Sequence, residues 1–352
     1  MVFSMTEDKG ILIQNIYYML SYAFQVLKQE NYREIAGEPF EHIQDLFAAI
    51  LAKGIAQQLK RGLYREYIPK AESLSVLRGK LDIQETLNNR LRQRRQLGCE
   101  YDELSENNIY NQILRTTADI LIRDPGVEAE RRQALKRAIL FFDGIDAVNP
   151  SAIHWNTLGY HRSNQTYRML MNICYFVLDG MLQTTEQGQH RMREFSDEHM
   201  ERLYEKFILE YYRAHHPHLR PSPAQVKWDL DEDNDERALM FLPAMQTDIT
   251  LRGDAGTLII DAKYYGRIML EHHNSETVRS AHLYQIYAYV KNMDTNHTGD
   301  VSGVLLYART REELIPDFDY NIGGNRIGVK TLDLNKPFAL IAEQLDRLAN
   351  GL

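Results

Sequence analysis

Two strand-like runs joined by a turn, within residues 245–265, constrain the fold of this chain more than any other stretch. Residues 245–251 alternate in polarity, residues 252–256 (R-G-D-A-G) carry turn chemistry, and residues 257–264 are β-branched and apolar. The pattern predicts a β-hairpin with a loop of about five residues. Because side chains on a strand alternate between two faces, Asp261 and Lys263 are expected to share one face.

Hairpin pairing places Asp248 roughly opposite Asp261, with an uncertainty of one residue in the register. Cross-strand partners have Cβ atoms about 5 Å apart, and two carboxylates that close repel each other unless a cation lies between them. A hard divalent cation with oxygen ligands is the usual solution. Two acids and the ammonium of Lys263 could together hold Mg²⁺, orient a water and neutralise charge on a phosphodiester under attack.

A D-x-K tripeptide after an apolar strand is common by chance, so Asp261 and Lys263 alone do not establish a catalytic site. Asp248 strengthens the hypothesis, because an acid on the inward side of a strand needs a partner. The site hypothesis therefore depends on the hairpin register.

Net charge and cysteine content limit the classes of function. The formal net charge of the 352 residues is −8, which is unexpected for a protein that grips nucleic acid alone over a large surface. Two cysteines, Cys99 and Cys174, are too few for a disulfide framework or a C-x-x-C zinc site, so we expect a reducing cytoplasm. We see neither a signal peptide nor a membrane span.

Apolar residues at helical spacing predict amphipathic helices along most of the remaining chain. Ser105 is expected to cap a helix that runs to about residue 122, and a small β unit is expected at residues 64–83. A loop-rich region at residues 144–164 places a domain boundary near residue 160. The other predicted helices cover residues 15–27, 40–59, 131–142, 167–181, 198–212, 280–292 and 337–348, and a buried strand covers 301–307.

From about residue 198 onward the predicted order is helix, hairpin, helix, strand and terminal helix, which is typical of an α/β fold with a mixed sheet. The densest basic cluster lies elsewhere, at Arg90, Arg92, Arg94 and Arg95. It could be a solvated face or a contact with phosphate or an acidic partner surface.

These residues resemble a known family. Asp248 and the D-A-K of residues 261–263 resemble the motif of the PD-(D/E)xK nuclease superfamily, and residues 285–289 resemble the Q-x-x-x-Y helix of one of its branches. Four further stretches, N-I-Y-Y-M-L-S-Y-A-F, L-R-G-K-L-D, Y-D-E-L-S-E-N and T-D-I-T, are similar to the McrC family, the nuclease subunits of McrBC modification-dependent restriction systems. They are spread over nearly the whole chain.

The resemblance implies a division of labour with an AAA+ GTPase resembling McrB, which forms a hexameric ring, binds the GTP and reads modified cytosine in double-stranded DNA. It implies an N-terminal α+β domain, residues 1–160, that docks onto the partner and stimulates its GTPase activity. It also implies a PD-(D/E)xK endonuclease domain at residues 161–352, with a mixed sheet flanked by helices. The chain has no G-x-x-x-x-G-K-[ST] loop of its own; the nearest stretch, residues 323–330, lacks the final pair.

By the same resemblance, Asp248, Asp261 and the backbone carbonyl of Ala262 ligate Mg²⁺, and Lys263 assists the attacking water. Glu205, Gln285 and Tyr289 are auxiliary residues. Two other functions remain open: a stand-alone DNA nuclease, and a non-catalytic activator of an AAA+ ring.

Overall fold

The computed structural model describes residues 7–8, 11–24, 35, 38, 40, 42–179, 182–184, 190–192, 197–230, 240–264, 269–272, 275–309 and 316–352. The chain forms two compact units, one of residues 1–46 and 194–352 and the other of residues 47–193. Each unit is described by itself below.

The first unit is built on a five-stranded mixed sheet with the strand order β10-β11-β14-β16-β15. β11 is parallel to β14 and β14 to β16, whereas both outer pairs are antiparallel. This confirms the predicted α/β class with a mixed sheet. The strands are β10 (Ile249–Arg252), β11 (Thr257–Lys263), β14 (Val301–Ala308), β15 (Phe318–Ile322) and β16 (Asn325–Leu332).

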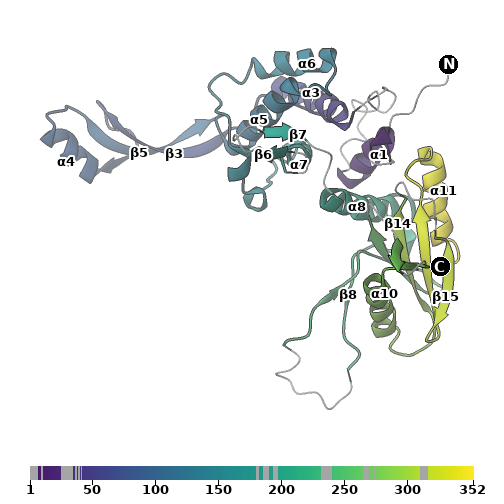
Figure 1. Cartoon of the computed structure of the whole chain (residues 1–352). Helices are drawn as coiled ribbons and strands as arrows, with labels where there is room; N and C mark the ends of the chain where they lie inside the picture. Colours follow the sequence, from purple (N-terminus) through teal and green to yellow (C-terminus); the bar gives the residue numbers. More distant parts are fainter. Residues whose placement is uncertain are drawn as a thin grey trace. The chain divides into compact units, whose positions relative to one another are not determined.

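Helices cover both faces of this sheet, and Figure 1 shows α10 and α11 on opposite sides of it. α10 packs closely because β14 carries Gly303, where a Cβ atom would lie only 2.7 Å from side chains of Ile286 and Val290. α8 packs against β11 and β10, and its Tyr212 donates a hydrogen bond to the carbonyl of Leu345 on α11. The helices are α1 (Ile13–Phe24), α8 (Asp197–His215), α10 (Ser280–Met293) and α11 (Phe338–Ala349).

Small elements complete the first unit. They are the two-stranded ribbons β1 (Glu7–Asp8) with β2 (Ile11–Leu12), β8 (Gln225–Val226) with β9 (Met245–Gln246) and β12 (Met269–His272) with β13 (Ser275–Val278), and the 3-10 helix η4 (Pro217–Leu219). Among the described residues of the whole chain, no helix is both long enough and apolar enough to cross a membrane.

The second unit consists of a helical body and an arm, which Figure 1 shows extending from it. The arm is a three-stranded antiparallel sheet, β3-β5-β4, that ends in α4. Its strands are β3 (Glu66–Leu74), β4 (Lys80–Asp82) and β5 (Leu97–Ser105), and α4 covers Ile83–Leu91. The body contains α3 (Ile43–Arg61), α5 (Ile109–Arg123), α6 (Ala129–Ile139), α7 (Tyr167–Leu178), η2 (Pro150–Ala152), η3 (Trp155–Thr157), and β6 (Leu182–Thr184) with β7 (His190–Met192).

The expected helix cap at Ser105 is wrong. Ser105 ends β5, which pairs with β3 over nine residues, so the chain stays extended to that point. The cap is Asn108, whose Oδ1 accepts a hydrogen bond from the backbone N–H of Asn111 at 3.2 Å. The other predicted helices are present within a few residues. Residues 25–27, 41 and 180–181 of these predicted helices lie outside the described part of the chain.

The compact units also differ from the expected division at residue 160. The first helix belongs with the C-terminal half, because Tyr22 on α1 packs its ring 5.7 Å from Phe207 and 5.6 Å from Tyr211 of α8. Residues up to 193 belong with the arm and its body, where Tyr167 on α7 donates a hydrogen bond to Asn111 on α5 at 2.8 Å.

Candidate active site

The predicted hairpin forms, and its register brings the two acids together. Ile249 pairs with Ile260 and Thr250 with Ile259, so one further step along the ladder sets Asp248 opposite Asp261. The first run is not one continuous strand, however. Met245–Gln246 pairs with β8 instead, and Asp248 lies in a bend immediately before β10.

Asp248 is fixed to the neighbouring strand by its own side chain. Its Oδ2 accepts a hydrogen bond from the backbone N–H of Ala262 at 2.9 Å. Burial raises the pKa of Asp248, although Lys263 and this hydrogen bond act in the opposite direction. The carboxylate is therefore held beside Asp261 with one oxygen already engaged.

Asp261 and Lys263 form a buried ion pair on one face of β11. Lys263 Nζ lies 3.0 Å from Asp261 Oδ2, and the two residues are only 8% and 1% exposed. Apart from this ion pair, neither carboxylate oxygen of Asp261 accepts a hydrogen bond from any group in the described part of the chain. Burial raises the pKa of Asp261 to about 7, with Lys263 opposing the rise and Asp248 adding to it.

The charge on Lys263 is secured by its acidic neighbours. Burial alone would lower its pKa, but the carboxylates of Asp261 and Asp248 outweigh that effect, and the pKa is raised. Lys263 is therefore an ammonium at neutral pH, held in a fixed direction between two acids.

Two glutamates on α8 face the same cluster. Burial raises the pKa of Glu205 to about 7, and the negative charges of Asp248 and Glu201 add to the rise. Burial also raises the pKa of Glu201, against the pull of Lys263. The two residues are four positions apart, so they lie on one helical face. The structure thus sets the predicted auxiliary Glu205, and a second acid, beside the paired strands.

The predicted pair on α10 is also present. Gln285 Nε2 donates a hydrogen bond to the hydroxyl of Tyr289 at 2.8 Å. Burial raises the pKa of Tyr289, with Gln285 opposing the rise and the charges of Asp261 and Asp248 adding to it. The pair therefore lies within electrostatic reach of the acids.

The sequence and the fold of this chain are similar to those of known proteins. A family model described as "McrBC 5-methylcytosine restriction system component" matches residues 5–308. The chain belongs to this family. The resemblance predicted from the sequence motifs is confirmed at this level.

A curated relative within the McrBC family is the type IV methyl-directed restriction enzyme EcoKMcrBC of Escherichia coli strain K12. It is 27% identical over 341 residues, which cover 96% of this chain and 97% of the relative. A chain in the refined half-complex from a tetradecameric assembly of Thermococcus gammatolerans McrB AAA+ hexamers with bound McrC is similar with a TM-score of 0.53. It is 19% identical, and the match covers 96% of this chain and 75% of that one. This second likeness concerns the fold alone.

Three residues near the site did not emerge from the sequence pattern of this McrBC family member. Glu201 lies four residues before Glu205, and that spacing could have revealed it. His282 is three residues before Gln285 on α10 and is buried. Burial, Lys263 and Arg279 together lower its pKa to about 4. The third residue is Tyr307 on β14, which forms a hydrogen bond with His282. No local sequence pattern indicates this contact between a helix and a strand.

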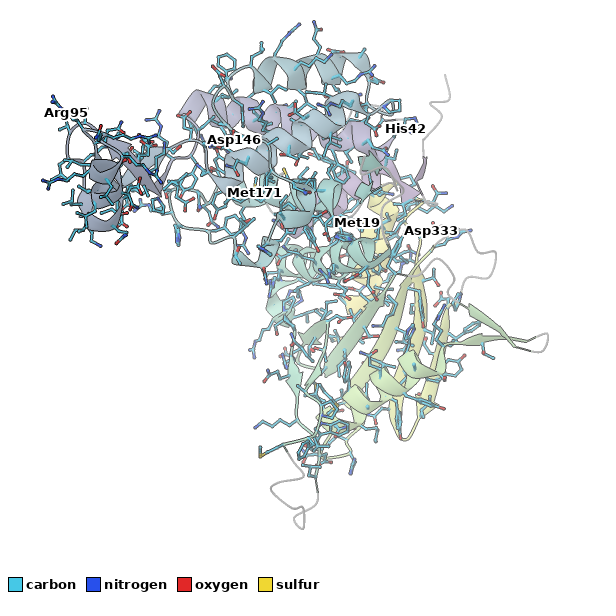
Figure 2. The ribbon with its side chains drawn as sticks, turned by 60° about the vertical axis from the view of Figure 1, so that its left-hand side comes forward. Met19, His42, Arg95, Asp146, Met171 and Asp333 are labelled. Atoms are coloured by element: carbon cyan, nitrogen blue, oxygen red, sulfur yellow. The ribbon has the colours of Figure 1, made fainter. Side chains whose placement is uncertain are left out.

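The predicted arginine cluster is not part of this site. Arg90 lies in the last turn of α4 and Arg92 caps its end. Arg94 and Arg95 lie in the segment that leads to β5, and all four are exposed. They belong to the other compact unit, and Figure 2 labels Arg95 at the end of the arm. Their contact with phosphate or with a partner remains a prediction.

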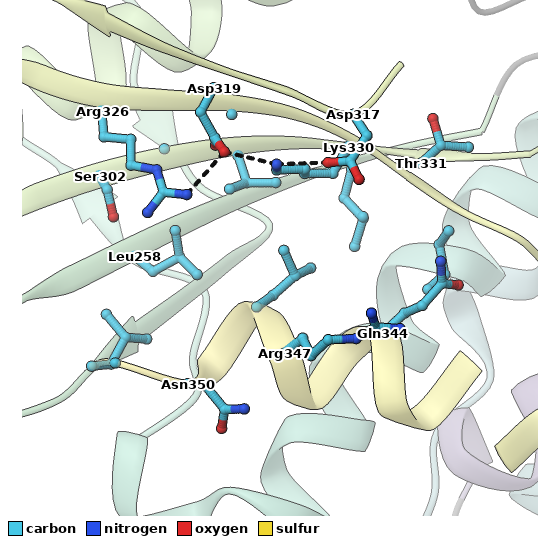
Figure 3. A pocket seen from close by; sticks show the side chains of 18 residues that line it. Leu258, Ser302, Asp317, Asp319, Arg326, Lys330, Thr331, Gln344, Arg347 and Asn350 are labelled. Carbon is cyan, nitrogen blue, oxygen red and sulfur yellow. Dashed lines mark hydrogen bonds and ion pairs between the residues drawn. The ribbon is translucent and has the colours of Figure 1, made fainter. Parts of the chain in front are cut away.

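A cavity of about 370 Å³ lies on the opposite face of the sheet, between β14, β16 and α11. Figure 3 shows the chain of ion pairs above it, in which Asp319 contacts both Arg326 and Lys330, and Lys330 also contacts Asp317. Leu258, Val304 and Leu306 line its floor. Asp261 and Lys263 point to the other side of β11, so this cavity is separate from the candidate active site.

Proposed function

We propose that this chain is the Mg²⁺-dependent DNA endonuclease subunit of a GTP-dependent, cytoplasmic restriction complex that acts on DNA carrying modified cytosine. The observation that carries the proposal is the buried cluster of Asp248, Asp261 and Lys263 on two paired strands, in a chain of the McrBC family. The arrangement has the acid, acid and lysine of PD-(D/E)xK nucleases.

The donor set suits a small hard cation. Asp261 Oδ2 pairs with Lys263, whereas its buried Oδ1 accepts no hydrogen bond from the described groups, and such an orphaned acceptor needs a partner. No three acidic, histidine or cysteine side chains in the described ranges surround an ion by themselves. Mg²⁺ usually binds through one or two carboxylates and keeps several waters. Asp248, Asp261 and the carbonyl of Ala262 would hold it, and when bound it would polarise the phosphate and acidify a water.

The chain's own residues then orient the reaction. Lys263 donates hydrogen bonds from a buried ammonium, which can hold the attacking water and stabilise negative charge on the phosphorane oxygens. Gln285 holds the hydroxyl of Tyr289 by a hydrogen bond, within reach of the charges of Asp261, Asp248 and Lys263. Glu205, with a pKa of about 7, can take up or release a proton near neutral pH.

GTP binding belongs to a partner in this proposal. The glycine-rich stretch at residues 323–330 forms a tight hairpin turn that continues into β16, since Ile322 pairs with Asn325, whereas the phosphate-binding loop of a P-loop GTPase leads from a strand into a helix. The chain's formal charge of −8 also suits a protein whose partner grips the duplex. The partner would be an AAA+ GTPase ring resembling McrB, the protein named in the similar structure, and the segment 1–160 is expected to contribute the docking surface.

Cleavage by variants of the reconstituted complex tests the proposal. The chain is combined with an AAA+ GTPase partner resembling McrB, GTP, Mg²⁺ and cytosine-methylated plasmid. We expect Asp261→Ala and Lys263→Ala to lower the cleavage rate about 100-fold or more, with binding of the partner and stimulation of its GTPase unchanged. Asp254→Ala is the matched control, because Asp254 is an exposed acid in the turn of the same hairpin.

Other outcomes separate the remaining functions. Normal cutting by Asp261→Ala or Lys263→Ala would end the nuclease assignment. Efficient cutting by the purified chain with Mg²⁺ alone indicates a stand-alone nuclease. Unchanged restriction by Asp248→Ala, with GTPase stimulation intact, indicates a non-catalytic activator.

A further inference from the structure

The face of α10 toward the sheet carries three polar side chains, of which the proposed function uses two. His282, Gln285 and Tyr289 are spaced three and four residues apart, so they lie on one face of the helix. Gln285 and Tyr289 bind each other. His282 instead reaches across to the sheet.

His282 contacts the residue that stands beside Lys263. Its Nδ1 is 2.8 Å from the hydroxyl of Tyr307, and the two rings lie 5.9 Å apart. Tyr307 is on β14, and it is the register partner of Lys263 on the parallel strand β11. Paired residues of neighbouring strands stand side by side on the same face, about 4.8 Å apart. The Tyr307 ring therefore flanks the side chain of Lys263.

Packing alone does not account for this polar pair. His282 is 9% exposed and Tyr307 is fully buried, and burying polar groups costs free energy even when they bind each other. Apolar residues of similar volume would fill the same space, as Ile286, Leu305 and Val329 do nearby. A hydrogen bond adds what an apolar contact lacks, namely a fixed orientation for the Tyr307 ring.

We propose that His282 and Tyr307 are positioning residues that hold the Lys263 ammonium against Asp261, an inference that rests on the nuclease function proposed above. The hydrogen bond keeps the tyrosine ring from turning, and the ring confines the aliphatic part of Lys263. Because the imidazole is neutral at neutral pH, it adds no positive charge that would repel the ammonium.

Steady-state cleavage by the GTPase complex tests this role. His282→Phe and Tyr307→Phe each remove the hydrogen bond and keep a ring. We expect each to lower kcat tenfold or more, with KM for DNA and GTPase stimulation unchanged. The double variant should be no slower than either single one, since both remove the same interaction. His282→Asn, which keeps a polar atom near the position of Nδ1, should recover most of the rate.

Controls separate this inference from packing and from the proposed function. Tyr284→Phe alters an exposed residue of the same helix and should behave as the parent chain. Unchanged kcat in His282→Phe, or additive losses that His282→Asn does not recover, would overturn the positioning role. Lys263→Ala is measured in parallel: if it cleaves normally, the nuclease function itself fails, whereas an inactive Lys263→Ala beside a fully active His282→Phe rejects only this inference.

Discussion

At the scale of single residues, the candidate site gathers several buried carboxylates around one lysine ammonium. Asp261 is almost fully buried, and Lys263 is the group that pairs with it within the described structure. Asp248 and Glu201 add further negative charge nearby. Such a cluster is costly for a folded protein without a bound cation, and functional sites are where costs of this kind are found.

The raised pKa of Asp261 predicts how stability changes with pH. Its folded pKa is about 7 and an unfolded aspartate has a pKa of about 3.9. The folded state therefore binds the proton more tightly, and the group's penalty grows as the pH rises from about 4 to about 7. At pH 8 without divalent cations, Asp261→Asn should raise the free energy of unfolding, on the order of 2 kcal/mol.

Urea denaturation at pH 4 and pH 8 in the presence of a chelator measures this difference, which should nearly vanish at the lower pH. Mg²⁺ should stabilise the parent chain at pH 8 and have little effect on Asp261→Asn. A variant less stable than the parent at pH 8 would contradict the assignment of the charge cost to this carboxyl.

At the scale of elements, α1 packs against α8, and α8 packs against the strands β10 and β11 that carry the site. Tyr22 of α1 contacts aromatic rings of α8. Tyr18 of α1 stacks on Phe338 of α11, with the ring centres 4.4 Å apart. Asn15 on α1 is buried, and its amide donates hydrogen bonds to the carbonyls of Leu334 and Lys336 at 2.7 and 2.8 Å. One side chain thus ties α1 to the connection between β16 and α11.

Replacement of Asn15 tests the strength of this connection. Asn15→Ala leaves two carbonyls without their donor, so we expect a loss of about 2 kcal/mol in the free energy of unfolding. Asn296→Ala, at an exposed loop position, should change it by less than about 0.5 kcal/mol. Denaturant titrations of both variants provide the comparison, and equal stabilities would show that the connection is held by other contacts.

Sequence patterns predict those helices and strands whose apolar spacing can be recognised within a single segment of the chain. The hairpin and the shared face of Asp261 and Lys263 follow from the two-residue strand period, and α10 follows from its apolar spacing. The hairpin of β15 and β16 was missed, although Gly323 and Gly324 both adopt positive φ and a Gly-Gly turn between strand-like runs is a known signal. The contact of His282 with Tyr307 depends on tertiary packing across 25 residues, which no local pattern specifies.

At the scale of the whole molecule, the chain leaves one compact unit and returns to it. Residues 1–46 and 194–352 form a single unit, and residues 47–193 are inserted between them. The loop-rich region near residue 160 predicts two domains that follow each other along the chain. The two observed units differ, because local composition does not indicate which distant helices pack together. The N-terminal helix is consequently part of the unit that holds the candidate active site.

This arrangement predicts the behaviour of fragments. A fragment of residues 161–352 lacks α1, so it exposes the rings of Phe207 and Tyr211 and loses the Asn15 hydrogen bonds. We expect it to aggregate, or to unfold without a cooperative transition in thermal circular dichroism. A fusion that restores residues 1–46 should recover cooperativity, and a sharp transition of the 161–352 fragment at the parent temperature would contradict the contact between α1 and α8.

The hydrogen bond from Ala262 to Asp248 also bears on which ion this edge of the sheet would admit. A backbone amide already occupies one oxygen of Asp248, so this carboxylate could not bind an ion through both of its oxygens without losing that hydrogen bond. Calcium seeks about six to eight oxygen ligands in a roomy shell, whereas magnesium tolerates a half-hydrated, octahedral one. Discrimination against calcium would thus originate in a main-chain N–H at the end of a strand, which substitutions of side chains other than Asp248 would leave in place.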